Sequence, residues 1–91
     1  MILDLGDGVG AVVLRMPEDL VGHEIDISPV GQDDRRHHVE VLPRQAGPRT
    51  VFAAVYPGLA EGSWTLWRTT TEPALVVDVT GGRVTEVDWP T

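Results

Sequence analysis

The sequence predicts an all-β domain, a sandwich of antiparallel sheets. Val, Ile and Thr, which favour strands, make up 25 of the 91 residues. Lys is absent, and Gln and Met are rare, so three good helix formers are nearly missing. Ten Gly and seven Pro separate apolar runs at short intervals, which is typical of sandwiches and barrels. The length allows one domain with a single core.

Seven strands are predicted, each an apolar or alternating run that ends at Gly, Pro or charged residues. They are Gly10 to Met16, His23 to Ser28, His37 to Leu42, Thr50 to Tyr56, Ser63 to Arg68, Ala74 to Thr80 and Val84 to Trp89. Pro17 to Leu20 can form a single helical turn, because Pro suits the first helical position. Pro29 to Arg36 and Arg44 to Pro48 are predicted as loops, since Gly, Pro and charged residues dominate them.

The segment Pro57 to Gly62 is predicted to be a hairpin loop, which fixes the register of the strands on either side. In this register Trp64 points into the core, whereas Phe52, Tyr56 and Trp67 lie together on the opposite face. Covering three such rings would be worth several kcal/mol, at roughly 25 cal/mol per Å² of apolar area. Tyr and Trp are also frequent in interface hot spots.

We therefore expect Phe52, Tyr56 and Trp67 to form an interface. Through it the protein would self-associate as a homo-oligomer or dock a partner, either another protein or a carbohydrate stacked on the rings. The alternative is that the chain covers this face itself, for example with the loop Pro29 to Arg36.

A second hairpin is predicted over Gly81 to Arg83, with a bulge that sets Val77 opposite Val87. Its outer face then carries three carboxylates, Asp78, Glu86 and Asp88. Such an acidic face is unfavourable unless an Arg or a cation lies nearby. A solvated face that protects an edge strand from aggregation is the preferred interpretation over Ca²⁺ binding or acid–base catalysis.

The three His residues are candidate metal ligands. His37 and His38 are adjacent in a strand and point to opposite faces, so at most one of them can join His23. If the two His-bearing strands are neighbours, four side chains share one outward face: His23, His38, Asp26 and Glu40. This set would suit a divalent transition metal. No closely spaced His pattern supports it, so solvated surface positions are preferred and no other cofactor is expected.

Charge and composition exclude several classes of function. Fourteen acidic residues against seven Arg give a net charge of −7, which disfavours nucleic acids and anionic membrane surfaces. The absence of Cys excludes disulfides, thiol catalysis and thiolate metal sites. Ser28 and Ser63 lie outside any Gly-x-Ser-x-Gly motif, so an enzyme is not expected. An enzyme that acts on a small ligand ranks third among the functions considered, after an interaction module and a metal-binding protein. Without a spanning segment or a charged leader, the expected location is the cytoplasm.

The stretch Val51 to Trp89 contains Pro57-Gly-Leu59, then Ser63-Trp-Thr-Leu66, then an apolar strand and a Gly-Gly hairpin. In this pattern it resembles the C-terminal half of prealbumin-like sandwiches, which include carboxypeptidase regulatory-like domains and the B-type repeats of collagen-binding adhesins. The resemblance implies a seven-stranded, Ig-like sandwich that acts as a non-catalytic accessory or interaction module. The chain departs from the cross-linking members, because it has no Lys to form an isopeptide bond.

Overall fold

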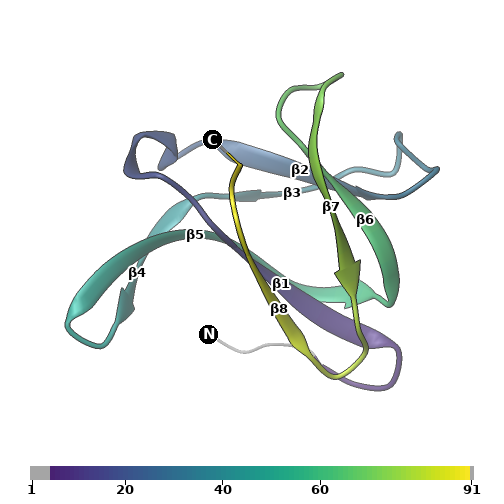
Figure 1. The fold of residues 1–91 in the computed structure, drawn as a ribbon, viewed down its shortest axis with the longest axis horizontal. Coiled ribbons are helices and arrows are strands. Elements are labelled where there is room, and N and C mark those ends of the chain that lie inside the picture. Colours follow the sequence, from purple (N-terminus) through teal and green to yellow (C-terminus); the bar gives the residue numbers. More distant parts are fainter. Residues whose placement is uncertain (1–4, 91) are drawn as a thin grey trace.

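The computed structural model describes residues 5–90, which form two four-stranded β-sheets (Figure 1). The strands are β1 (Val9–Arg15), β2 (Glu24–Pro29), β3 (His37–Glu40), β4 (Leu42–Ala46), β5 (Arg49–Ala60), β6 (Gly62–Trp67), β7 (Pro73–Val79) and β8 (Val84–Asp88). The first sheet has the order β4-β5-β1-β8, and the second has the order β3-β2-β6-β7. The predicted all-β class with two packed sheets is confirmed. The helical turn is also confirmed, as the 3₁₀ turn η1 (Glu18–Leu20) that follows Pro17.

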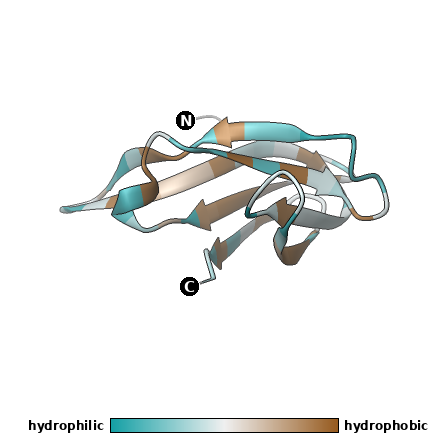
Figure 2. Cartoon of the chain, turned by 90° about the horizontal axis from the view of Figure 1, so that it is seen from above, coloured by the Kyte–Doolittle hydropathy of each residue, from teal (hydrophilic) through white to brown (hydrophobic). Residues whose placement is uncertain are grey.

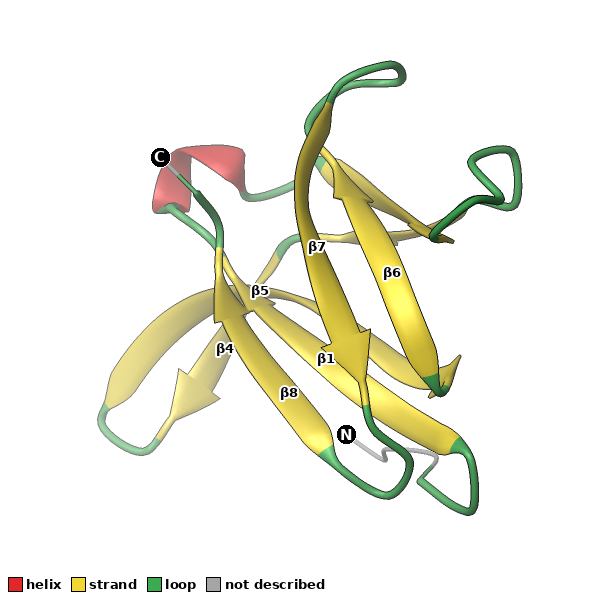
Figure 3. Cartoon of the chain, turned by 45° about the vertical axis from the view of Figure 1, so that its right-hand side comes forward, coloured by secondary structure: helices red, strands yellow, loops and turns green. Residues whose placement is uncertain are grey.

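The predicted number of seven strands is wrong, because the described part of the chain has eight. The run predicted as one strand from His37 to Leu42 crosses from the second sheet to the first at Val41, whose side chain is fully buried. The predicted loop Arg44 to Pro48 forms most of β4 and its turn. Gly47 has a φ of 64°, so the chain reverses tightly and β4 pairs with the start of β5. This ribbon projects beyond the sheets (Figure 3).

The predicted hairpin between β5 and β6 is wrong, because the two strands lie in different sheets. β5 continues to Ala60 and β6 begins at Gly62, so Glu61 alone separates them. One residue is too short for a hairpin loop, so the chain turns a corner between the sheets. β5 pairs instead with β1, and β6 pairs with β2 and β7.

The second predicted hairpin is also wrong, because the turn after β7 carries the chain from the second sheet to the first. β8 pairs in parallel with β1, with Ala11 beside Val84 and Arg15 beside Asp88. The first sheet is therefore mixed and not purely antiparallel. Val77 and Val87 still face the core, but from opposite sheets.

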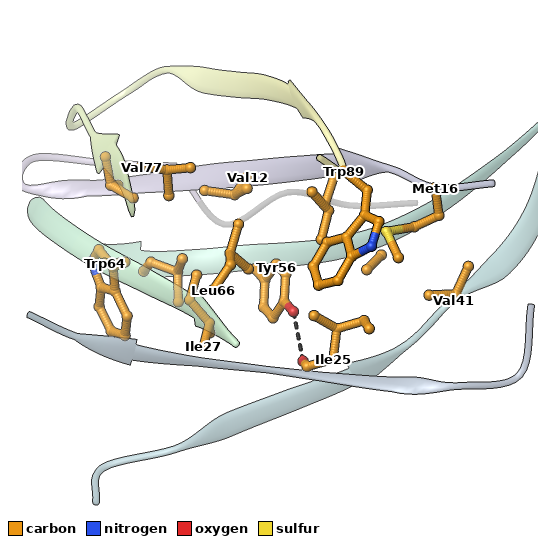
Figure 4. Packing of buried hydrophobic residues seen from close by; sticks show 14 residues of the cluster. Val12, Met16, Ile25, Ile27, Val41, Tyr56, Trp64, Leu66, Val77 and Trp89 are labelled. Carbon is orange, nitrogen blue, oxygen red and sulfur yellow. Dashed lines mark hydrogen bonds between the residues drawn. The ribbon is translucent and has the colours of Figure 1, made fainter. Parts of the chain in front are cut away.

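The core lies between the sheets, and each sheet contributes alternate residues to it (Figure 4). The first sheet contributes Val12, Leu14 and Tyr56, and the second contributes Ile27 and Leu66, which pair with each other across β2 and β6. In Figure 2 the most hydrophobic segments lie in the strands of both layers. This layer of apolar side chains leaves the outer faces and the ends of the sandwich as the surfaces on which a site can form.

Candidate functional site

Tyr56 lies in the core and is not part of an exposed strip as predicted. Its side chain is 2% exposed, and its hydroxyl donates a hydrogen bond of 2.6 Å to the carbonyl oxygen of Ile25 in the opposite sheet (Figure 4). Burial raises the pKa of the Tyr56 phenol well above its usual range, and the charge of Asp26 raises it further. The hydroxyl therefore links the two sheets as a neutral donor.

Trp67 points to the outer face of the second sheet, but it is not available to a partner. The side chain is only 7% exposed. Its indole Nε1 donates to the Ser28 hydroxyl at 2.9 Å, and the Arg36 guanidinium lies 3.8 Å from the ring centroid. Because Arg36 belongs to the predicted loop Pro29 to Arg36, the alternative that the chain covers its own aromatic face holds for Trp67.

Phe52 is partly buried and packs against the core cluster. It lies in the first sheet, on the same side of β5 as Tyr56, whereas Trp67 is in the second sheet. The three rings do not share a surface, so the predicted aromatic interface loses the arrangement on which it depended. The cause is the corner at Glu61, which separates β5 from β6.

Arg36 joins two loops, a structural role that the sequence patterns do not predict. Its Nε donates to the Asp33 carbonyl oxygen at 2.6 Å, its Nη1 to Asp26 Oδ2 at 3.2 Å, and its Nη2 to the Thr70 carbonyl oxygen at 2.8 Å. These bonds join the β2–β3 loop to the β6–β7 loop across the ring of Trp67. No motif signals this role, because two of its partners, Asp26 and Thr70, lie 10 and 34 residues away in the sequence.

The predicted metal ligands are only partly brought together. β2 and β3 are neighbours as expected, with Asp26 opposite His38 and Glu24 opposite Glu40. However, Asp26 pairs with Arg36, and His38 Nε2 lies 3.2 Å from Glu24 Oε2. His23 precedes β2 and contacts Leu20 and Val41 through its backbone. Within residues 5–90, no three His, Asp or Glu side chains form a group that could hold a metal ion.

The predicted acidic face is divided between the two sheets. Glu86 and Asp88 lie on β8 and flank Arg15 on β1, at 3.2 and 2.6 Å. Arg15 therefore supplies the positive charge that the sequence analysis required, and it lowers the pKa of Asp88. Asp78 lies on β7 and accepts a hydrogen bond of 2.7 Å from the Ser63 hydroxyl. These groups are ordinary surface pairs and offer no enclosed site.

A hollow of about 480 Å³ lies at the end of the sandwich, where the β2–β3 loop meets the corner between β5 and β6. We call it the end hollow. It is lined by Pro29, Gln32, Arg35, His37, Gly58, Leu59, Ala60, Glu61, Gly62, Ser63 and Trp64. The two segments are held together by a hydrogen bond of 3.0 Å from Val30 N–H to the Ser63 carbonyl oxygen. The volume is within the usual range for a small-molecule site, about 300–1,000 Å³.

Trp64 and Leu59 form the apolar part of the end hollow. Both side chains are nearly buried and belong to the core cluster, so the hollow borders the core. Trp64 Nε1 donates to the Ala60 carbonyl oxygen at 2.8 Å, which fixes the indole across the corner. The imidazole of His37 meets the indole edge-on, with 5.7 Å between ring centroids. The apolar part is therefore rigid and preformed.

Two charged side chains line the polar part of the end hollow. Arg35 Nη1 donates to Gln32 Oε1 at 2.8 Å. Glu61 Oε1 accepts a hydrogen bond of 3.0 Å from the backbone N–H of Gly81, which draws this carboxylate toward the β7–β8 turn. The hollow thus combines apolar surface with a few polar groups, the combination that binds and orients a small ligand.

A second, smaller hollow of about 210 Å³ lies beside Trp67, where Glu24, Asp26, Arg68, Thr69 and Thr70 line it. Asp26 is already paired with Arg36. The end hollow is therefore the better candidate for a binding site. The sequence did not reveal it because its walls come from two separate segments, residues 29–37 and 58–64, that meet only in the folded sandwich.

Comparison with known proteins places this chain in no group: no family model, no curated protein and no solved structure matches it. In the described residues, no helix has the length and apolar character needed to cross a membrane.

Proposed function

We propose that the protein is a non-catalytic binding module and that its ligand occupies the end hollow. The observation that carries this proposal is the hollow itself, which joins about 480 Å³ of space to the indole of Trp64 and to polar groups on two separate connections. Sites of this shape bury most of a small ligand and use few polar contacts to orient it.

The polar groups of the end hollow support binding more than chemistry. The Ser63 hydroxyl donates to Asp78, and the His37 ring contacts Trp64 at its edge, so no hydroxyl is paired with the imidazole as a nucleophile would be. The Glu61 carboxylate accepts the backbone N–H of Gly81, so one of its two oxygens is already occupied by a contact within the protein.

The prealbumin-like, Ig-like affiliation and a cytoplasmic location remain part of the proposal. The two-sheet all-β architecture supports an accessory module of this general kind, and a chain without Cys is compatible with a reducing compartment. A homo-oligomer or partner complex through Phe52, Tyr56 and Trp67 is not proposed, since Tyr56 and Trp67 are buried.

Protein-observed NMR tests the proposal with three neutral probes, indole, phenol and benzamide, at millimolar concentration. The chain has three Trp residues, and their indole N–H signals report on different places. Trp64 lines the end hollow, whereas the Trp67 indole is bonded to Ser28 beneath Arg36. We expect saturable shifts of the Trp64 signal and of backbone signals from residues 58–64, with the Trp67 signal unchanged.

Two matched variants make the test specific. Gln32→Phe places a ring at the rim of the end hollow and should abolish the shifts. Gln45→Phe makes the same change at an exposed position on β4 and should leave them intact. Shifts that are absent for all three probes, or that cluster around residues 67–70, would show that the end hollow is not a binding site.

A further inference from the structure

The end hollow contains a cation that no residue from 5 to 90 neutralises. Arg35 donates one hydrogen bond, from Nη1 to Gln32, and forms no ion pair with any residue of the described chain. Its neighbour Arg36 uses Nε, Nη1 and Nη2 on Asp33, Asp26 and Thr70. In a chain with a net charge of −7, an unpaired guanidinium at the edge of an apolar hollow is a distinctive feature.

The local structure holds Arg35 in place. The β2–β3 loop folds through two consecutive tight turns, with Gln32 N–H bonded to the Pro29 carbonyl oxygen and Arg35 N–H bonded to the Gln32 carbonyl oxygen, both at 3.0 Å. Gln32 then accepts from the guanidinium of Arg35. Because Gln32 occupies one Nη1 donor, other N–H groups of the planar guanidinium remain for a ligand.

We propose that the end hollow selects ligands that carry a single carboxylate beside an apolar group, with the carboxylate at Arg35 and the apolar group against Trp64 and Leu59. This inference rests on the proposed function. Guanidinium groups bind carboxylates through two parallel hydrogen bonds, and the small accessible edges of the indole and the leucine line the same hollow.

The remaining charges explain why one carboxylate is favoured over a more highly charged anion. Glu61 also lines the end hollow, and the whole chain carries an excess of seven negative charges. A phosphate dianion would be repelled by Glu61 and by the net negative charge, and it has no apolar group to place against Trp64 and Leu59. A monocarboxylate with a branched or flat apolar body places its charge at Arg35 and buries the rest of its surface.

This chemistry exists in two kinds of molecule, a peptide that ends in an apolar residue and a free small carboxylic acid. The titration therefore uses four probes: N-acetyl-L-leucine, N-acetyl-L-leucinamide, N-acetylglycine and 4-methylpentanoate. The leucine pair shares one apolar body and differs in the carboxylate. N-acetylglycine keeps the carboxylate and lacks the apolar body, and 4-methylpentanoate keeps both but lacks the amide of a peptide.

We expect N-acetyl-L-leucine to bind about tenfold more tightly than its amide and than N-acetylglycine, as measured by shifts of the Trp64 indole signal. Arg35→Gln should reduce the affinity for the acid to that for the amide and leave the affinity for the amide unchanged. Arg49→Gln, which removes an equal charge from the projecting ribbon, should change neither. An NMR spectrum typical of a folded protein is required of each variant before the affinities are compared.

The outcomes separate this inference from the proposed function. If acid and amide bind equally, or if Arg49→Gln weakens the acid as much as Arg35→Gln does, the carboxylate assignment is wrong while the binding module stands. If N-acetylglycine and N-acetyl-L-leucine bind with equal affinity, the placement of an apolar group against Trp64 and Leu59 is wrong. If no probe binds and the neutral probes also fail, both proposals are wrong. Tighter binding of 4-methylpentanoate than of N-acetyl-L-leucine supports a free acid as ligand, and the reverse supports a peptide terminus.

Discussion

Arg36→Ala is expected to destabilise the protein by about 3 kcal/mol. The substitution removes the ion pair with Asp26, the bonds to the Asp33 and Thr70 carbonyl oxygens, and the guanidinium over Trp67. The Arg36 side chain is 22% exposed, so solvent weakens the ion pair to about 1 kcal/mol. The two carbonyl bonds add about 1 kcal/mol together, and the cation–π contact adds about 1 kcal/mol.

A loss of this size is large for a domain of 91 residues, whose total stability is about 5–14 kcal/mol. The melting temperature should fall by about 15 °C. Guanidinium chloride unfolding followed by tryptophan fluorescence measures the free energy of unfolding, and thermal circular dichroism gives the melting temperature. Arg36→Lys, which keeps the charge and loses the planar fork, should fall between Arg36→Ala and the wild type.

Arg35→Ala is the matched control, because it removes the same side chain one position earlier. Within residues 5–90 the Arg35 side chain forms one hydrogen bond, the exposed one to Gln32, so the loss should stay below about 0.5 kcal/mol. If Arg36→Ala unfolds at the denaturant concentration of the wild type, or if Arg35→Ala loses as much, Arg36 does not hold the two loops together and the account of Trp67 burial given above is refuted.

Two further substitutions test the core and the closure of the sheets. Tyr56→Phe should cost about 1–2 kcal/mol, because it leaves the buried Ile25 carbonyl without its donor. The raised pKa of Tyr56 means that its contribution is fully present below pH about 10, the usual Tyr pKa, and is lost as the pH rises above it, so the wild type should weaken there and the variant should not. The chain has no Lys or Cys and a single Tyr, so unfolding curves between pH 9 and 11 isolate this group. Gly10→Ala should destabilise the protein by about 1–3 kcal/mol, because the added methyl group would lie 2.4 Å from the Thr80 carbonyl oxygen. Gly6→Ala is the control and should be nearly neutral, since its methyl group meets no atom within 4 Å. Equal unfolding midpoints for the two variants would contradict the close approach of β1 to the β7–β8 turn.

Local patterns in the sequence identified most strands but not their partners. Strand composition and Gly or Pro boundaries located the runs that became β1, β2, β6, β7 and β8 within a few residues. Pairing was inferred from hydrophobic matching, which needs one face of a strand to be polar. In β5 the four residues 53–56 are all buried, and so are residues 64–67 in β6. With both faces covered, alternation does not distinguish the two possible registers.

The same limit applies to the candidate sites. His23, Asp26, His38 and Glu40 were predicted to share a face. The β2–β3 register places Asp26, His38 and Glu40 on one face, whereas His23 precedes β2 and is not part of the pairing. The sequence did not predict where Arg36 lies in space, and Arg36 forms an ion pair with Asp26 from a loop. The end hollow was missed for a related reason: it depends on where Glu61 turns the chain, and that corner is set by the pairing of β5 with β1 and not by a local motif.

The adjacent residues Arg35 and Arg36 show how one loop serves two surfaces of the sandwich. Arg36 reaches over the outer face of the second sheet, and three hydrogen bonds from its nitrogens hold the guanidinium over the ring of Trp67. The ring is therefore not exposed as an apolar surface. The same bonds fix the loop at the point where Arg35 reaches the end hollow. The loop that closes the outer face therefore also holds the backbone of Arg35 beside the hollow, which reduces the conformational entropy lost when the guanidinium binds a carboxylate. Covering Trp67 and exposing Arg35 are two consequences of a single loop conformation.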